Sequence, residues 1–219
     1  MKAPILACIF DLDGVIVDTA KYHFLAWQRL AQEMGISFTE ADNEQLKGVS
    51  RAESLRIILD MGQIQLDEAH FEAKMAQKNE WFLEYIYQMS PEEVLPGVSA
   101  FLDELKAHHI RIALGSASKN ALTILDQIGM RDYFEVIVDG NLIAAAKPDP
   151  QVFLKAAEGL GIAPQNCVVF EDAEKGVEAA HRGQMRAVGV GSPDILGQAE
   201  LVIPGFAHFR LTDLNTLAH

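Results

Sequence analysis

Short apolar segments that end at turn residues recur along the chain and predict the strands of a buried sheet. They occupy residues 5–10, 110–114, 136–138, 167–170 and 187–190. A strand buried on both faces is apolar throughout, and such strands are typical of parallel sheets. Helical patterns lie between several of them and place one apolar stripe against a sheet. One stripe consists of Val98, Phe101, Leu102 and Leu105. The alternation of strands and helices predicts an α/β fold.

The pattern changes between about residues 22 and 89, where the chain shows helical periodicity and no convincing strand. The stripe of one long helix steps by four and three residues and includes one lysine. It consists of Phe71, Met75, Lys78, Phe82, Tyr85 and Met89. Another helix is expected to begin at Ser50, because Ser50 and Glu53 match a capping box whose side chains satisfy free backbone donors.

The return to the alternating pattern is marked at residues 90–97 by Ser-Pro and Pro-Gly dipeptides, since proline blocks helix continuation and glycine permits a turn. We therefore expect a Rossmann-like, doubly wound parallel sheet as the core domain, formed by residues 1–17 and 92–219. An all-helical cap domain is expected to be inserted at residues 18–91. A chain of 219 residues is long enough for both.

Composition excludes several classes of protein. The sequence is 49% hydrophobic and 22% charged, which is typical of a soluble globular protein. A net charge of -13 argues against nucleic acid, whose binding needs a basic face. No apolar run reaches membrane-spanning length and no signal-peptide pattern opens the chain, so we expect neither secretion nor anchoring. Cys8 and Cys167 lie in predicted strands and are expected to be core thiols, which fits a reducing cytoplasm.

Two aspartates follow directly on the first predicted strand. Asp11 and Asp13 stand at its carboxyl end, where ligand sites of open α/β sheets lie, and two residues apart they point the same way. Two ionised carboxylates this close repel each other, so a cation or proton must share the site, and Mg²⁺ prefers oxygen ligands. An Asx-rich turn that closes the strand explains the same residues equally well.

The segment Ser-Ala-Ser-Lys-Asn at residues 116–120 follows the second predicted strand and opens a helix. Small hydroxyl residues and free backbone donors there could hold a phosphate. Ser118 or Asn120 could instead cap the helix.

Two more charged segments stand at comparable places. Lys147 precedes Pro148 and a helix, although a lone lysine is more often a solvated side chain. Glu171 and Asp172 end the strand at residues 167–170 and need counter-charge, unless they serve as helix N-terminal charges. Four such elements in order, each at a strand end, are hard to attribute to chance.

This series resembles the motifs of the haloacid dehalogenase superfamily, and the resemblance covers the whole chain. Longer strings resemble the β-phosphoglucomutase family within it. They are Asp18-Thr19-Ala20, Tyr22-His23-Phe24 with Trp27, the string from Asn43 through Lys47-Gly48 to Ser50-Arg51, and Ser116-Ala117-Ser118-Lys119-Asn120.

The resemblance implies a mechanism. Asp11 is the expected nucleophile, and Asp13 is the expected general acid and base, whose backbone carbonyl also binds one Mg²⁺ ion per active site. Asp11 is also an expected metal ligand, and Asp172, supported by Glu171, is expected to complete the protein's metal ligands. Ser116 and Lys147 are expected to stabilise the charge on the transferred phosphoryl group.

The resemblance also implies a substrate-binding set. It consists of Thr19, His23, Trp27, Lys47, Gly48, Arg51, Ser54, Lys78, Ser116, Ala117, Ser118, Lys119, Asn120 and Lys147. An arginine fork suits a phosphate dianion, although Lys47 and Arg51 could be surface charges at a helix start. His23 could couple cap closure to Asp13 or could be a structural histidine.

The implied activity is interconversion of β-D-glucose 1-phosphate and D-glucose 6-phosphate through an aspartyl-phosphate and β-glucose 1,6-bisphosphate. A sugar-phosphate phosphatase, in which water replaces the sugar hydroxyl, is the alternative enzyme. A noncatalytic sugar-phosphate binder is disfavoured, because a binder needs no nucleophile. We expect a cytoplasmic monomer whose partners are small sugar phosphates, without nucleic acid or membrane. Residues 140–146 and the tail beyond Pro204 carry no motif that we can place.

Overall fold

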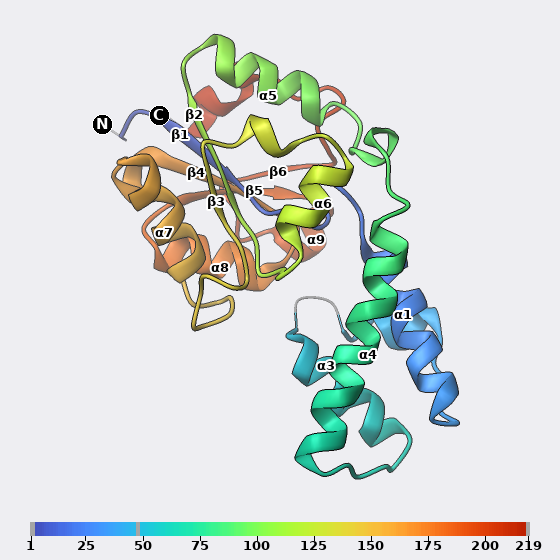
Figure 1. Ribbon diagram of the computed structural model, residues 1–219. Coiled ribbons are helices and arrows are strands. Elements are labelled where there is room, and N and C mark those ends of the chain that lie inside the picture. The colour runs from blue at the N-terminus through green and yellow to red at the C-terminus, as the bar shows by residue number, and fades with distance from the viewer. Residues whose placement is uncertain (1–2, 47–48, 218–219) are drawn as a thin grey trace. The chain divides into compact units, whose positions relative to one another are not determined.

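The computed structural model describes residues 3–46 and 49–217 (Figure 1). The chain forms two compact units. One consists of Met1–Asp18 with Ser90–His219 and the other of Thr19–Met89. The first unit is α/β and the second is helical, which confirms an α/β core with an inserted helical segment.

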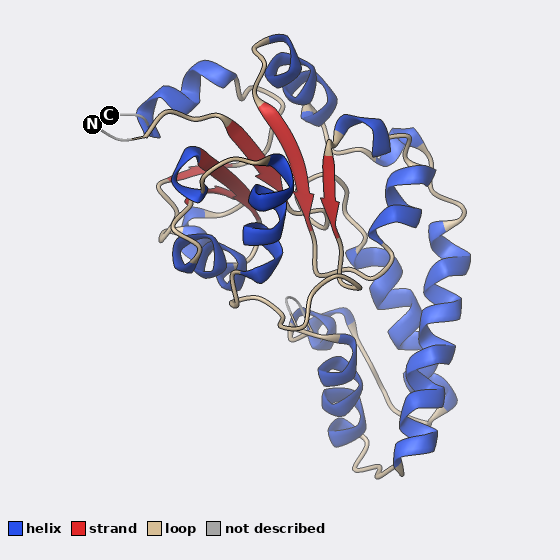
Figure 2. Cartoon of the chain, turned by 60° about the vertical axis from the view of Figure 1, so that its left-hand side comes forward, coloured by secondary structure: helices blue, strands red, loops and turns tan. Residues whose placement is uncertain are grey.

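The α/β unit contains a six-stranded parallel sheet in the order β3-β2-β1-β4-β5-β6. Figure 2 shows its strands in red with helices around them. The strands are β1 Ala7–Phe10, β2 Arg111–Gly115, β3 Val136–Val138, β4 Cys167–Glu171, β5 Arg186–Val190 and β6 Leu201–Ile203. The first five confirm the predicted strands within a few residues. The sequence analysis missed β6, because three residues at a sheet edge give too little pattern.

Helices cover both faces of this sheet, as a doubly wound fold requires. On one face α7 Gln151–Leu160 packs on β1 to β3, and α8 Glu174–Arg182 packs on β4 and β5. On the other face α5 Val98–Ala107 packs on β2 and on the 3-10 segment η4 Leu211–Leu217. The remaining elements of the unit are η1 Pro91–Glu93, α6 Ala121–Gln127, η2 Arg131–Tyr133, η3 Pro164–Asn166 and α9 Pro193–Leu196.

A cluster of phenylalanines fills the face of the sheet under α5. Phe10 and Phe170 of neighbouring strands stack with ring centroids 4.6 Å apart. Phe101 of α5 lies 5.4 Å from Phe206 and 5.1 Å from Phe209, measured between centroids. The two last rings belong to the tail beyond Pro204, which therefore completes the core. Cys8 and Cys167 are buried free thiols, as predicted.

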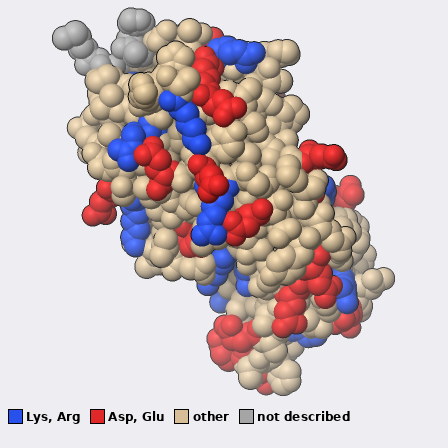
Figure 3. Space-filling model, turned by 45° about the horizontal axis from the view of Figure 1, so that its top comes forward, with Lys and Arg blue, Asp and Glu red and all other residues tan. Residues whose placement is uncertain are grey.

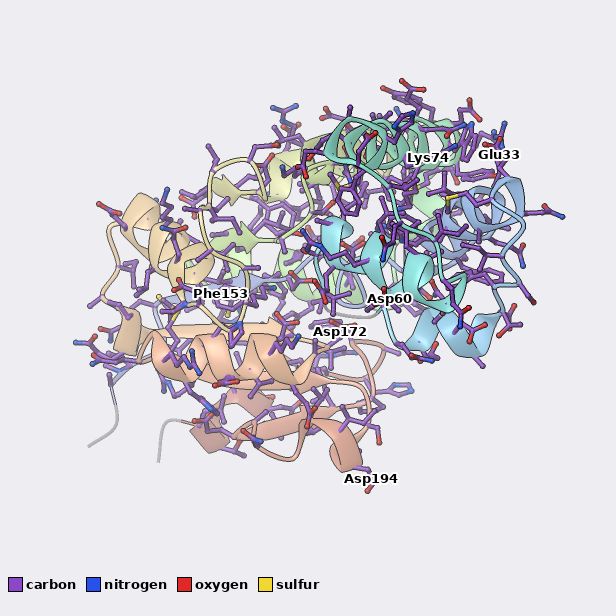
Figure 4. The ribbon with its side chains drawn as sticks, turned by 90° about the horizontal axis from the view of Figure 1, so that it is seen from below. Glu33, Asp60, Lys74, Phe153, Asp172 and Asp194 are labelled. Atoms are coloured by element: carbon purple, nitrogen blue, oxygen red, sulfur yellow. The ribbon has the colours of Figure 1, made fainter. Side chains whose placement is uncertain are left out.

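The helical unit consists of α1 Ala20–Glu33, α2 Glu40–Glu44, α3 Arg51–Met61 and α4 Glu68–Ile86. The predicted long helix is confirmed as α4, but it ends before Met89. It packs along α1, where Lys74 Nζ lies 3.9 Å from Glu33 Oε2 (both labelled in Figure 4). None of the described helices is long and apolar enough to cross a membrane.

The predicted capping box at Ser50 is half formed. Its hydroxyl accepts a hydrogen bond from Glu53 N at 3.2 Å, but the Glu53 carboxylate lies 3.3 Å from Arg56 Nη1. The sequence analysis missed a complete box at α2, where Thr39 and Asp42 each accept a hydrogen bond from the other's backbone N–H.

Surface charges of both signs are interspersed on the face drawn in Figure 3. Among the described side chains on that face, Lys and Arg do not gather into one continuous basic surface.

The phenylalanine cluster generates a stability prediction. Phe206→Ala leaves a cavity beside four aromatic rings, so we expect it to lower the free energy of unfolding by about 3–5 kcal/mol. Ile195→Ala, at a side chain that is 57% exposed, is the matched control and should change it by no more than about 0.5 kcal/mol. Urea unfolding of both variants measures this. Equal effects would show that the tail does not complete the core.

Candidate active site

The carboxyl ends of three strands meet at one edge of the core sheet. Because β1 lies between β2 and β4 and all three run parallel, the residues that follow them lie side by side. Asp11 follows β1, Ser116 follows β2, and Glu171 is the last residue of β4. A 3.0 Å hydrogen bond from Asp11 N to the Phe170 carbonyl continues the ladder past the end of β1.

Lys147 joins this edge from the connection between β3 and α7. Its Nζ lies 2.6 Å from Asp11 Oδ1 and 2.8 Å from Glu171 Oε2, and the carboxylate side chains are only 9% and 2% exposed. The ring of Phe153, labelled in Figure 4, has its centroid 4.7 Å from the ammonium. Burial disfavours the charge on Lys147, but the two carboxylates outweigh it and raise the pKa of Lys147 above its usual value. A solvated lysine is therefore ruled out.

Asp11, Glu171 and Asp172 form an acidic cluster, in which one oxygen of each carboxylate lies within 4.8 Å of the others. Asp172, labelled in Figure 4, is partly open to solvent. Desolvation of its carboxyl group, followed by the charges of Glu171, Asp11 and Asp13, nevertheless raises the pKa of Asp172 to about 8. A cation would relieve this repulsion, and three carboxylates suit a hard divalent ion. The cluster therefore fits a metal ion.

Asp13 is half-buried, and its charge acts on Asp172. Its side chain is not one of the three that make up the acidic cluster. The metal contact expected of Asp13 is through its backbone carbonyl and stays a prediction.

Two glycines make room for the acids. A Cβ at Gly14, whose φ of +77° favours glycine, would lie 2.0 Å from Asp172 Oδ2. A Cβ at Gly176, inside α8, would lie 1.9 Å from Glu171 Cδ. The sequence analysis gave Gly176 no role. Its signal was a glycine inside a helix, which costs about 1 kcal/mol relative to alanine and needs a reason.

The loop at residues 116–120 is tied to itself and to β3. Ser116 is buried and its N–H donates to the Val138 carbonyl at 2.9 Å. The Ser116 hydroxyl accepts from Ser118 N at 3.1 Å, and the Ser118 hydroxyl accepts from Asn120 N at 3.3 Å. Asn120 occupies the N-cap position of α6 without a side-chain cap bond. The serines thus shape a turn at the sheet edge, on which Ala117 and Lys119 are exposed.

In the helical unit, Lys78 and His23 form a buried pair. Lys78, 1% exposed, has its Nζ 2.8 Å from His23 Nδ1 and 4.6 and 4.7 Å from the ring centroids of Phe82 and Trp27. Burial lowers the pKa of His23 well below its usual value, and the charge of Lys78 lowers it further. His23 is therefore a neutral acceptor. A structural histidine with a hydrogen-bond partner, the alternative role for His23, would make this contact. The coupling of His23 to cap closure stays a prediction.

The other predicted residues of this unit lie in helices or at their starts. Arg51 donates to Asn79 Oδ1 at 2.6 Å and is half-buried, so it is not a plain surface charge. Ser54 donates to the Ser50 carbonyl of its own helix, and Thr19 is fully buried. Lys47 and Gly48 lie outside the described residues.

Comparisons with known proteins show which family the chain is similar to. A sequence profile of the haloacid dehalogenase-like hydrolases matches residues 5–184. The chain is 44% identical to a β-phosphoglucomutase of Bacillus subtilis, over 90% of this chain and 88% of that protein. It is 34% identical to a phosphorylated carbohydrates phosphatase of Thermotoga maritima, over 80% and 79%. The crystal structure of a β-phosphoglucomutase from Clostridium difficile is 39% identical, superposes with a TM-score of 0.90 and covers 96% of each chain.

The fit of Glu171 against Gly176 generates a prediction. Gly176→Ala should favour α8 but push the Glu171 carboxylate away from Lys147, so we expect activity to fall by at least about tenfold while the thermal midpoint holds or rises. Gly183→Ala, at the end of the same helix, is the control and should keep its activity, because a Cβ there would lie no closer than 3.3 Å to its neighbours. Activity assays and thermal unfolding of both variants test this prediction. Full activity in Gly176→Ala would show that the site does not need Gly176 to make room for Glu171.

Proposed function

The chain belongs to the haloacid dehalogenase-like hydrolase family, and we propose that within it the chain is a β-phosphoglucomutase. It is an isomerase that interconverts β-D-glucose 1-phosphate and D-glucose 6-phosphate. The observation that carries this assignment is 44% identity to a β-phosphoglucomutase across nine-tenths of the chain, above the 34% to a phosphatase.

Asp11 is the proposed nucleophile. Its carboxylate oxygen attacks phosphorus, the bond from phosphorus to the leaving oxygen breaks, and an aspartyl-phosphate forms. The Lys147 ammonium, 2.6 Å from Asp11 Oδ1, supports this role, because a cation beside the nucleophile can stabilise the charge that builds up on the phosphoryl oxygens. The buried Ser116, at the next strand end, is proposed to donate to the same oxygens.

Asp13 is the proposed general acid and base. It protonates the departing sugar oxygen and takes the proton of the attacking sugar hydroxyl. Its place two residues after the nucleophile supports this, since both stand at the same strand end. β-Glucose 1,6-bisphosphate then turns over, and Asp11 recovers a phosphoryl group from its other end.

The acidic cluster is proposed to hold one Mg²⁺ ion through Asp11 and Asp172, with the Asp13 carbonyl as a further ligand and Glu171 in support. When bound, the ion neutralises charge on the phosphoryl group. The chain's own part is to gather these oxygens and to keep Glu171 paired with Lys147.

The helical unit is proposed to select the substrate through Lys47, Gly48, Arg51, Ser54 and Lys78, with Thr19, His23 and Trp27. Arg51 suits a phosphate dianion because its guanidinium donates in a planar fork. We further propose that the protein acts as a cytoplasmic monomer on small sugar phosphates, without nucleic-acid or membrane partners. Its net charge of -13 argues against a nucleic-acid partner, and its two buried free thiols fit a reducing cytoplasm.

The acceptor of the phosphoryl group distinguishes a mutase, which uses a sugar hydroxyl, from a phosphatase, which uses water. With β-glucose 1-phosphate, Mg²⁺ and a trace of glucose 1,6-bisphosphate, we expect glucose 6-phosphate to exceed free phosphate, and no product from the α anomer. Asp11→Asn should reduce the rate by at least about 10⁴-fold, because the nucleophile is lost. Asp194→Asn, at an exposed aspartate in α9, is the control. Predominant free phosphate would instead assign a phosphatase, the activity of the Thermotoga maritima relative.

Mg²⁺ should stabilise the folded protein. At a concentration 100 times its dissociation constant, an ion that binds only the folded state adds about 2.7 kcal/mol. Asp172→Asn removes one of three crowded carboxylates, so we expect higher stability without Mg²⁺ and a smaller increment with it. Thermal unfolding with and without Mg²⁺ tests this against Asp194→Asn. An unchanged increment in Asp172→Asn would refute the metal assignment.

A further inference from the structure

The connection from β3 to α7 lies along the 116–120 loop. Ser116 N donates to the Val138 carbonyl at 2.9 Å, and Gly140 N donates to the Ser118 carbonyl at 3.0 Å. A Cβ at Gly140 would lie 2.2 Å from the carbonyl oxygen of Ala117, so only glycine allows the two backbones this close. The segment that begins at residue 139 therefore packs directly against the backbone of the 116–120 loop.

The buried carboxylate of Asp139 binds the next part of this segment, at Asn141. Asp139, 4% exposed, accepts hydrogen bonds from Asn141 N at 2.9 Å and from Asn141 Nδ2 at 3.0 Å. Asn141 Nδ2 also donates to the Lys119 carbonyl at 2.9 Å. An amide nitrogen has two hydrogens, so one can serve Asp139 and the other Lys119. Asp139 thus orients the Asn141 amide that binds the 116–120 loop.

The same connection is tied to α7 at its other end. Gln151 Oε1 accepts from Ala144 N at 2.5 Å and from Ala145 N at 3.3 Å, and Lys155 Nζ donates to the Leu142 carbonyl at 2.6 Å. Two residues after Ala145 the chain reaches Lys147, which binds Asp11. One continuous segment therefore links the 116–120 loop to the active-site lysine.

We propose that Asp139 and Asn141 are positioning residues, which fix the 116–120 loop and so set the affinity of the site for phosphoryl groups. The inference rests on the proposed function, in which Ser116 binds the phosphoryl oxygens, and on the expectation from the sequence that the 116–120 loop holds a phosphate. Neither residue touches the reacting atoms. They act through the Lys119 and Ser118 carbonyls and the close backbone contact at Gly140, in a segment to which the sequence analysis assigned no role.

The test uses the full-length protein with Mg²⁺ and two readouts, calorimetric binding of inorganic phosphate and the kcat and KM for β-glucose 1-phosphate. The variants are Asn141→Ala, Asn141→Asp, which keeps the shape but loses the donor, and Gly140→Ala, which separates the backbones. Asn166→Ala is the matched control. Its Nδ2 donates to the Pro4 carbonyl at 2.7 Å, at the opposite end of the sheet, so it loses the same kind of bond.

We expect each of the three variants to weaken phosphate binding and to lower kcat/KM by about tenfold or more, because a misplaced binding loop loses orientation. Asn166→Ala should lower the thermal midpoint by an amount similar to Asn141→Ala, yet leave phosphate binding within about twofold. Phosphate binding in all three variants equal to that of Asn166→Ala would overturn the proposal. A wild type without mutase activity, with the difference in phosphate binding intact, would refute the proposed function and support the positioning role.

Discussion

The ion pair of Lys147 with Asp11 and Glu171 is the interaction on which the active site depends. Two carboxylates at adjacent strand ends, each less than a tenth exposed, would repel each other and lose hydration, which a buried site tolerates only with a counter-charge. The lysine supplies it at 2.6 and 2.8 Å. It therefore offsets the repulsion between these two carboxylates, whereas Asp172, the third acid of the cluster, is exposed.

This pairing constrains residues far from it in sequence. Gly176 has no side chain because the Glu171 carboxylate needs that space, and Gly14 makes the same room for Asp172. Lys147 comes from a connection whose first residues bind the 116–120 loop, so Asp11, its counter-charge and that loop form one connected assembly. The parallel sheet provides the frame, since β1 runs between β2 and β4.

Sequence reasoning located the parts of this assembly that stand directly after strands. An apolar run predicts where each strand ends, and this pattern located Asp11, Ser116 and Glu171. Lys147 was located because the motif series includes it. Gly176 was missed because its role comes from the space that the Glu171 side chain occupies in the folded protein. Asn141 was missed because its amide binds the Lys119 carbonyl, 22 residues earlier, and Asp139 was missed because it acts through Asn141. No local sequence pattern records such contacts. The same reason hid Phe206 and Phe209, whose partners lie on α5 and the central strands. In the helical unit, the lysine on the apolar stripe of α4 was visible in the sequence, but its histidine partner required the fold.

In the proposed reaction the phosphoryl group passes from Asp11 to a sugar hydroxyl and not to water. The most direct measurement follows the reaction of β-glucose 1-phosphate in water enriched with oxygen-18. We expect glucose 6-phosphate whose phosphoryl group contains no solvent oxygen, with little free phosphate. Free phosphate that carries one solvent oxygen, formed as the main product, would contradict it.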